Sequence, residues 1–117
     1  MDYQPYIDRL KRLKNEEKRQ RAARRKRALK AADQIASRLR NDFGAEHIYL
    51  FGSTLLQDYF YLHSDIDIAV RGIAPEKFLR ALYEVNDMDH GFRVDLVDLP
   101  TSDDFLKRRI SDQGQEL

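Results

Sequence analysis

The chain has 117 residues, about the length of one domain, and its formal net charge is only +1. It contains no cysteine, which excludes a disulfide framework, a thiolate zinc site and a cysteine nucleophile. No uncharged apolar run has the length of a membrane-spanning helix, and the first residues lack the apolar segment of a secretory signal. We therefore expect a cytoplasmic protein that does not enter a membrane.

The small net charge conceals a strong asymmetry along the chain. Residues 1–40 carry 14 Lys or Arg and 5 Asp or Glu, whereas residues 41–117 carry 7 and 15. The first part therefore has a formal charge of +9 and the second part of −8. This division predicts a basic segment joined to an acidic body, with a different partner for each.

The basic segment is expected to form one long helix. From Pro5 to about Asn41 it has no glycine and no further proline, and strong helix formers dominate it. Gly44 is the expected stop signal. An apolar stripe at helical spacing should pack on the body, and it consists of Ala28, Ala32, Ile35, Leu39 and Phe43.

Before this stripe the predicted helix changes character. Residues 14–27 offer only two alanines as apolar side chains, so we expect this stretch to be solvated or covered by a partner. An earlier apolar group at helical spacing is a candidate partner contact, and we call it the arm patch: Tyr6, Ile7, Leu10 and Leu13. We divide the chain accordingly into a basic helical arm, residues 1–27, and a domain, residues 28–117.

The body alternates short apolar runs with amphipathic segments. The short runs predict strands at residues 47–51, 65–70 and 92–99. Helical spacing and capping residues predict helices at residues 75–87 and 102–110. The expected fold is an α/β (α+β) domain in which helices flank a mixed sheet of about three or four strands.

Three aspartates on the predicted strands are the candidate reactive groups. Asp65 and Asp67 alternate with apolar residues and so share one face of their strand, where their mutual repulsion calls for a cation. Mg²⁺ prefers such oxygen ligands and usually shares them with substrate phosphates. Asp95 completes the cluster if its strand pairs beside theirs, and three carboxylates can hold two metal ions for phosphoryl or nucleotidyl transfer. Asp98 has the opposite strand parity and is therefore not chosen.

Gly52 and Ser53 follow directly on the first predicted strand. A glycine there lets backbone N–H groups approach an anion, and a serine hydroxyl can bond a phosphate oxygen. The plainer interpretation is an ordinary turn, with the Asp-x-Asp pair on the solvated face of an edge strand. The combination of both motifs with a third strand-borne aspartate favours a nucleotide site. Three aromatic residues between the Gly-Ser and the Asp-x-Asp are candidates for contact with the base of a bound nucleotide: Tyr59, Phe60 and Tyr61.

With these motifs the sequence resembles the DNA polymerase beta-like nucleotidyltransferase superfamily, whose signature is a Gly-Ser, a later Asp-x-Asp and a third carboxylate. The short length, the sequence of residues 49–53 and the tail of residues 105–114 are similar to the minimal nucleotidyltransferases (MNT). Those are commonly antitoxins paired with HEPN-domain ribonuclease toxins. The resemblance covers about residues 28–114, and it departs from many relatives at residues 54–58, which supply neither an arginine nor a glycine.

The resemblance implies a nucleotidyltransferase antitoxin that uses ATP and Mg²⁺ to attach AMP to a tyrosine hydroxyl of a HEPN toxin. Gly52 and Ser53 would then hold the triphosphate and Asp65 and Asp67 the metal, while Asp95 would be a metal ligand that helps activate the acceptor hydroxyl. Two alternatives remain open: neutralisation by direct binding with a vestigial site, and transfer to RNA or a small molecule. A complex with the toxin is expected, whereas nucleic-acid binding by the arm is a hypothesis that the sequence does not favour.

Overall fold

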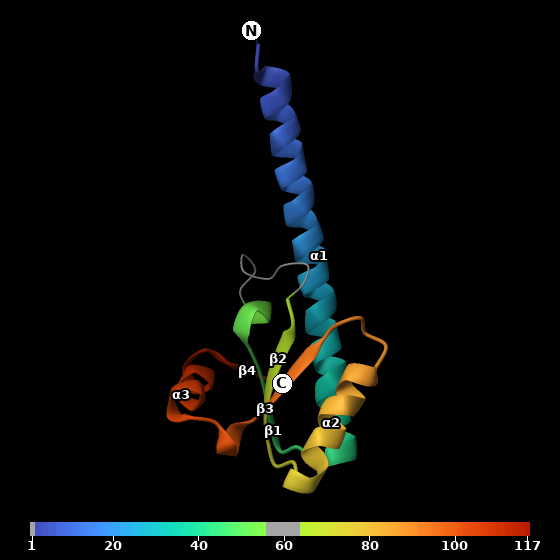
Figure 1. The fold of residues 1–117 in the computed structure, drawn as a ribbon, viewed down its shortest axis with the longest axis vertical. Coiled ribbons are helices and arrows are strands. Elements are labelled where there is room, and N and C mark those ends of the chain that lie inside the picture. Colours follow the sequence, from blue (N-terminus) through green and yellow to red (C-terminus); the bar gives the residue numbers. More distant parts are fainter. Residues whose placement is uncertain (1, 56–63) are drawn as a thin grey trace.

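A computed structural model describes residues 2–55 and 64–117 (Figure 1). Its elements are α1 (Gln4–Phe43), β1 (His47–Phe51), the short 3₁₀ helix η1 (Gly52–Leu55), β2 (Ile66–Arg71), α2 (Pro75–Asp87), β3 (Val94–Asp98), the 3₁₀ turn η3 (Leu99–Thr101), α3 (Asp104–Gln113) and β4 (Gln115–Glu116). The strands form one sheet in the order β3-β2-β1-β4. Because β2 pairs antiparallel with β1 and parallel with β3, the sheet is mixed, and the predicted fold class is confirmed.

The helix α1 has 40 residues and is therefore about 60 Å long at ~1.5 Å per residue. Gly44 ends it in a left-handed conformation (φ 71°), and the amide of Ala45 donates to the carbonyl of Leu39 (3.1 Å). Among the helices of the described segments, none is both long and apolar enough to cross a membrane. The prediction of one long helix stopped by Gly44 is confirmed, and α1 extends well beyond the body (Figure 1).

The two halves of α1 have different surroundings. Every residue from Asp2 to Gln20 is exposed, and this range includes the arm patch. From Arg21 onward, residues on the side facing the body are half-buried, and from Ala28 they are buried. The exposed stretch therefore ends at Gln20 rather than at Arg27 as predicted, because arginines that follow it contact the body of the same chain.

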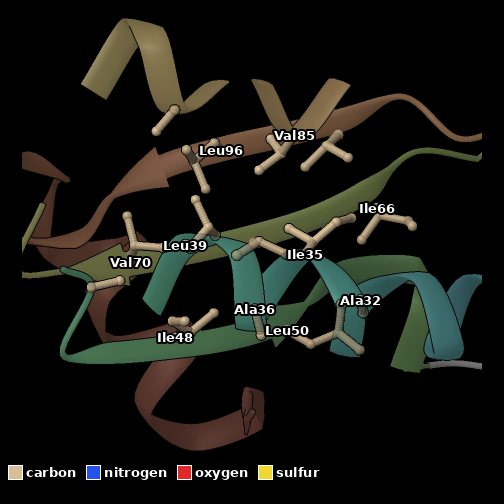
Figure 2. Packing of buried hydrophobic residues seen from close by; sticks show 14 of the residues in the cluster. Ala32, Ile35, Ala36, Leu39, Ile48, Leu50, Ile66, Val70, Val85 and Leu96 are labelled. Carbon is tan, nitrogen blue, oxygen red and sulfur yellow. The ribbon is translucent and has the colours of Figure 1, made fainter. Parts of the chain in front are cut away.

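The buried side of α1 packs with α2 on one face of the sheet (Figure 1). Figure 2 shows Ile35 and Leu39 of α1 lying beside the β2 residues Ile66 and Val70. All five residues of the predicted stripe are buried, and two further alanines extend it. α3 lies on the opposite face, over a smaller buried cluster of Phe51, Ala69, Leu99 and Ile110. Successive residues of β2 therefore face different layers.

The strand β4 is missing from the sequence prediction. Its two residues pair antiparallel with β1, and the amide of Leu117 donates to the carbonyl of Ile48 (2.8 Å). A strand of two polar residues has no alternation of apolar and polar side chains, so the sequence pattern does not predict it. Other predicted elements differ from the observed ones at their ends. β3 spans 94–98 rather than 92–99, and α3 spans 104–113 rather than 102–110.

Removing the exposed part of α1 should leave the fold intact. A chain that starts at Arg21 keeps every buried residue of α1, so we expect its free energy of unfolding to lie within about 0.5 kcal/mol of the full chain. A chain that starts at Asp33 lacks the first three buried alanines and also Arg24, Arg25 and Leu29, which contact the body. At about 0.8 kcal/mol per methyl group the alanines alone correspond to about 2 kcal/mol, so we expect a loss of more than about 2 kcal/mol. Urea denaturation of the three proteins measures both differences. A large loss on removal of residues 1–20 would mean that the exposed segment contributes to the core.

Candidate functional site

The sheet brings Asp67 and Asp95 side by side. They are direct partners in the parallel register of β2 and β3, and Phe51, the last residue of β1, is the partner of Asp67 on its other side. Ile66 and Ile68 are buried in the core between the sheet and α1, so Asp67 points to the opposite face, on which α3 packs. The same alternation along β3 places Asp95 on that face.

Asp65 lies just before β2, two positions from Asp67, and is half-buried. Burial raises the pKa of Asp67, the charges of Asp95 and Asp65 raise it further, and the charge of Arg109 lowers it; the result is about 6, against an ordinary value of 3.8. Asp65 and Asp95 therefore both lie within electrostatic range of Asp67. The two other predicted carboxylates thus lie near Asp67, and their repulsion makes its charged form less favourable.

Gly52 lets the end of β1 approach this carboxylate group closely. It has a positive φ of 78°, and a Cβ at this position would overlap Oδ2 of Asp67 and lie 3.2 Å from its Cγ. No other residue type combines this backbone conformation with this clearance. Ser53 follows Gly52 in η1 and is half-buried. The structure therefore places the Gly-Ser turn against the Asp-x-Asp strand.

A pocket of about 340 Å³ opens beside Gly52, and its walls come from β1, η1 and α3. It is lined by Phe51, Gly52, Leu55, Arg109 and Gln113. Sequence reasoning missed Arg109 because three successive basic residues in a predicted helix do not show which of them faces the sheet. A larger hollow of about 490 Å³ between β1, α3 and β4 includes none of the five predicted site residues.

Residues 33–117 match the protein family described as "Polymerase beta, Nucleotidyltransferase". The chain belongs to this nucleotidyltransferase family. The match begins inside α1 and includes all five predicted site residues, whereas the arm lies before it. Among functionally curated proteins, none matches the chain.

Several solved structures of toxin–antitoxin pairs are similar to this chain. One is a crystal structure of a toxin-antitoxin with AMP-PNP, with 29% identity and a TM-score of 0.62 over 73% of this chain and 70% of the other. A second, the toxin-antitoxin MntA-HpeT in a mutant form, has 31% identity and a TM-score of 0.59 over 73% and 69%. A third contains tri-AMPylated Shewanella oneidensis HEPN toxin in complex with MNT antitoxin, with 26% identity and a TM-score of 0.58 over 76% and 70%. The predicted resemblance to minimal nucleotidyltransferases is confirmed.

The oxygen donors at this site suit a hard divalent cation. Carboxylate oxygens are the ligands that Mg²⁺ prefers, and the excess negative charge around Asp67 favours a cation. Within residues 2–55 and 64–117, no three acidic or histidine side chains form a group that could hold an ion by themselves. Proteins commonly supply one or two carboxylates to Mg²⁺ and leave the other positions to substrate phosphates and water. The residues present fit that kind of shared site. The three aromatic residues predicted to contact the base, Tyr59, Phe60 and Tyr61, lie outside the described residues.

Replacing Asp67 by asparagine should stabilise the metal-free protein at neutral pH. The pKa of about 6 in the folded protein exceeds the ordinary 3.8, so the folded state holds the proton more tightly and stability falls as pH rises through this interval. The asparagine of the Asp67→Asn variant is neutral, so the variant does not lose stability by burying a charge as pH rises. We expect its Tm to exceed the wild-type Tm clearly at about pH 7.5 and only slightly at about pH 4.5. Thermal denaturation in the presence of a chelator measures this, and a Tm difference independent of pH would contradict the assigned pKa.

Proposed function

We propose that the protein is a nucleotidyltransferase antitoxin that transfers AMP from ATP, with Mg²⁺, to a tyrosine hydroxyl of a HEPN-domain toxin. The observation that carries this proposal is the juxtaposition of Gly52, Asp67 and Asp95 in a chain of the nucleotidyltransferase family. Two of the similar structures support it, since one includes AMP-PNP and another an AMPylated HEPN toxin.

The nucleotide would lie across the end of β1. We assign Gly52 and Ser53 to the triphosphate, because a turn without a side chain at its first residue exposes backbone N–H groups to an anion. Arg109 lines the adjoining pocket and adds a positive charge beside the phosphates. Phe51 and Leu55 supply apolar surface in the same pocket.

The carboxylates have separate tasks in this proposal. Asp65 and Asp67 are assigned to Mg²⁺, which when bound neutralises phosphate charge in the transition state. Asp95 is assigned to the acceptor side as a metal ligand, where its carboxylate takes the proton of the attacking hydroxyl. The tyrosine oxygen then forms a bond to the α-phosphorus of ATP. The bond from that phosphorus to the bridging oxygen breaks, and pyrophosphate leaves with the electron pair.

The test combines the purified protein with ATP labelled at the α-phosphate and a purified HEPN-domain toxin. We expect label on a tyrosine of that protein in Mg²⁺ and none in EDTA, together with a loss of its ribonuclease activity. No transfer by the wild-type protein would contradict the enzymatic proposal. Inhibition of the ribonuclease without transfer would instead support neutralisation by direct binding.

A further inference from the structure

Arg25 of α1 is bonded to the turn that contains Gly52 and Ser53. Its Nε donates to the carbonyl oxygen of Thr54 (2.8 Å), and its Nη2 donates to that of Leu55 (3.3 Å). The side chain is half-buried and joins two segments that lie 29 residues apart in the sequence. The basic part of α1 is therefore connected directly to η1.

These two hydrogen bonds suit the end of η1 at which they occur. Thr54 and Leu55 are its last residues, and the carbonyls at the end of a helix have no partner within it. A guanidinium presents N–H donors in a fixed planar fork and keeps its charge, so one side chain can serve two neighbouring carbonyls. Thr54 is itself completely buried. The C-terminal end of the turn is thus held both by burial and by Arg25.

The opposite end of η1 lies against the carboxylates. Gly52 begins the turn and touches Asp67 so closely that a Cβ would not fit between them. Gly52, which touches Asp67, lies only two and three positions before Thr54 and Leu55, which accept from Arg25. A shift of the turn at Thr54 would therefore change where Gly52 and Ser53 stand relative to Asp67.

We propose that Arg25 is a positioning residue for nucleotide binding: it holds η1 so that Gly52 and Ser53 are in place to receive the triphosphate. The inference rests on the proposed function of this turn. The adjacent Arg24 has a different task, because its guanidinium lies over the ring of Phe92, 4.4 Å from the centroid, and packs α1 on the body. The long helix therefore contributes to the site itself as well as to the core.

Three variants test the role of Arg25 in the transfer assay. Arg25→Ala removes both hydrogen bonds, and we expect KM for ATP to rise roughly tenfold with kcat little changed. Arg25→Lys keeps the charge and can restore only part of the contact, so we expect an intermediate KM. Arg27→Ala removes the same charge from an exposed position on the same helix and should keep the wild-type KM. An unchanged KM in Arg25→Ala, or a fall in kcat alone, would overturn the inference, because loss of folded enzyme lowers kcat without changing KM.

Hydrogen exchange separates this inference from the proposed function. In the nucleotide-free protein, amides of residues 53–55 should exchange faster in Arg25→Ala than in both wild type and Arg27→Ala, because the turn is then less restrained. Equal exchange in the three proteins would refute the positioning role whatever the transfer assay shows. Faster exchange together with a wild-type protein that transfers no AMP would refute the proposed function and leave Arg25 as the residue that holds the turn.

Discussion

Asp67→Asn should lower the rate of AMP transfer by about a hundredfold or more. A bound metal ion stabilises transition-state charge by several kcal/mol, and each ~1.4 kcal/mol corresponds to a factor of ten in rate. An amide is a poor ligand for Mg²⁺, and Asp67 is the carboxylate that lies between Gly52 and Asp95. The initial rate of label transfer to the HEPN protein measures the effect.

A matched control for this variant lies on the neighbouring strand. Asp98 ends β3 with the opposite parity to Asp95, so Asp98→Asn removes one carboxylate from the same sheet without touching the cluster. It should keep the transfer rate within about twofold of wild type. Because Asp67→Asn is expected to be at least as stable as wild type at neutral pH, unfolding would not explain its loss of activity. Comparable rates for the two variants would remove Asp67 from the mechanism.

Gly52→Ala should abolish most of the transfer activity at a moderate cost in stability. The residue has φ 78°, and an L side chain in the left-handed region costs about 1–2 kcal/mol. Its new Cβ would also displace the carboxylate of Asp67, and an error of 1 Å in the position of a reacting group can cost about a hundredfold in rate. We therefore expect a stability loss of about 1–2 kcal/mol and a rate loss of about a hundredfold.

Gly91 provides a control with the same backbone strain and no obstruction. Its φ is 80°, and a Cβ there would meet nothing within 4 Å. Gly91→Ala should therefore lose a similar amount of stability and keep its transfer rate. Urea denaturation and the transfer assay, applied to both variants, separate the two effects. Equal activities would mean that the close approach of Gly52 to Asp67 has no part in the reaction.

Local sequence patterns were enough to predict most helices and strands, and also the aspartates of the candidate site that lie on or beside strands. The alternation around Asp65 and Asp67 and the apolar neighbours of Asp95 determine which face each carboxylate takes, and a parallel register then makes Asp67 and Asp95 partners. Likewise, the stripe that begins at Ala28 follows from helical periodicity alone, and Gly44 ends the helix where its conformational freedom is needed.

The residues that α1 and α3 contribute to the candidate site could not be predicted, because their positions depend on contacts between segments far apart in the sequence. Nothing near Arg25 in the sequence indicates a bond to a turn 29 residues later, and composition instead favoured a solvated stretch. The position of Arg109 depends on how α3 is rotated against the sheet, which its row of basic residues does not reveal. Both arginines lie beside η1, whereas residues 54–58, which follow Gly52 and Ser53 in the sequence, include no basic side chain.

Because α1 is a continuous helix, it also fixes the helical phase between the arm patch and Arg25, which is bonded to η1. Leu13 and Arg25 are twelve positions apart, which corresponds to about 18 Å along the axis. Insertion of one residue between them would rotate the arm patch by about 100° around the axis, whereas insertion of seven would nearly restore its direction and move it about 10 Å farther away. If a partner binds the arm patch, the helix sets the distance and the direction from which that partner would face η1.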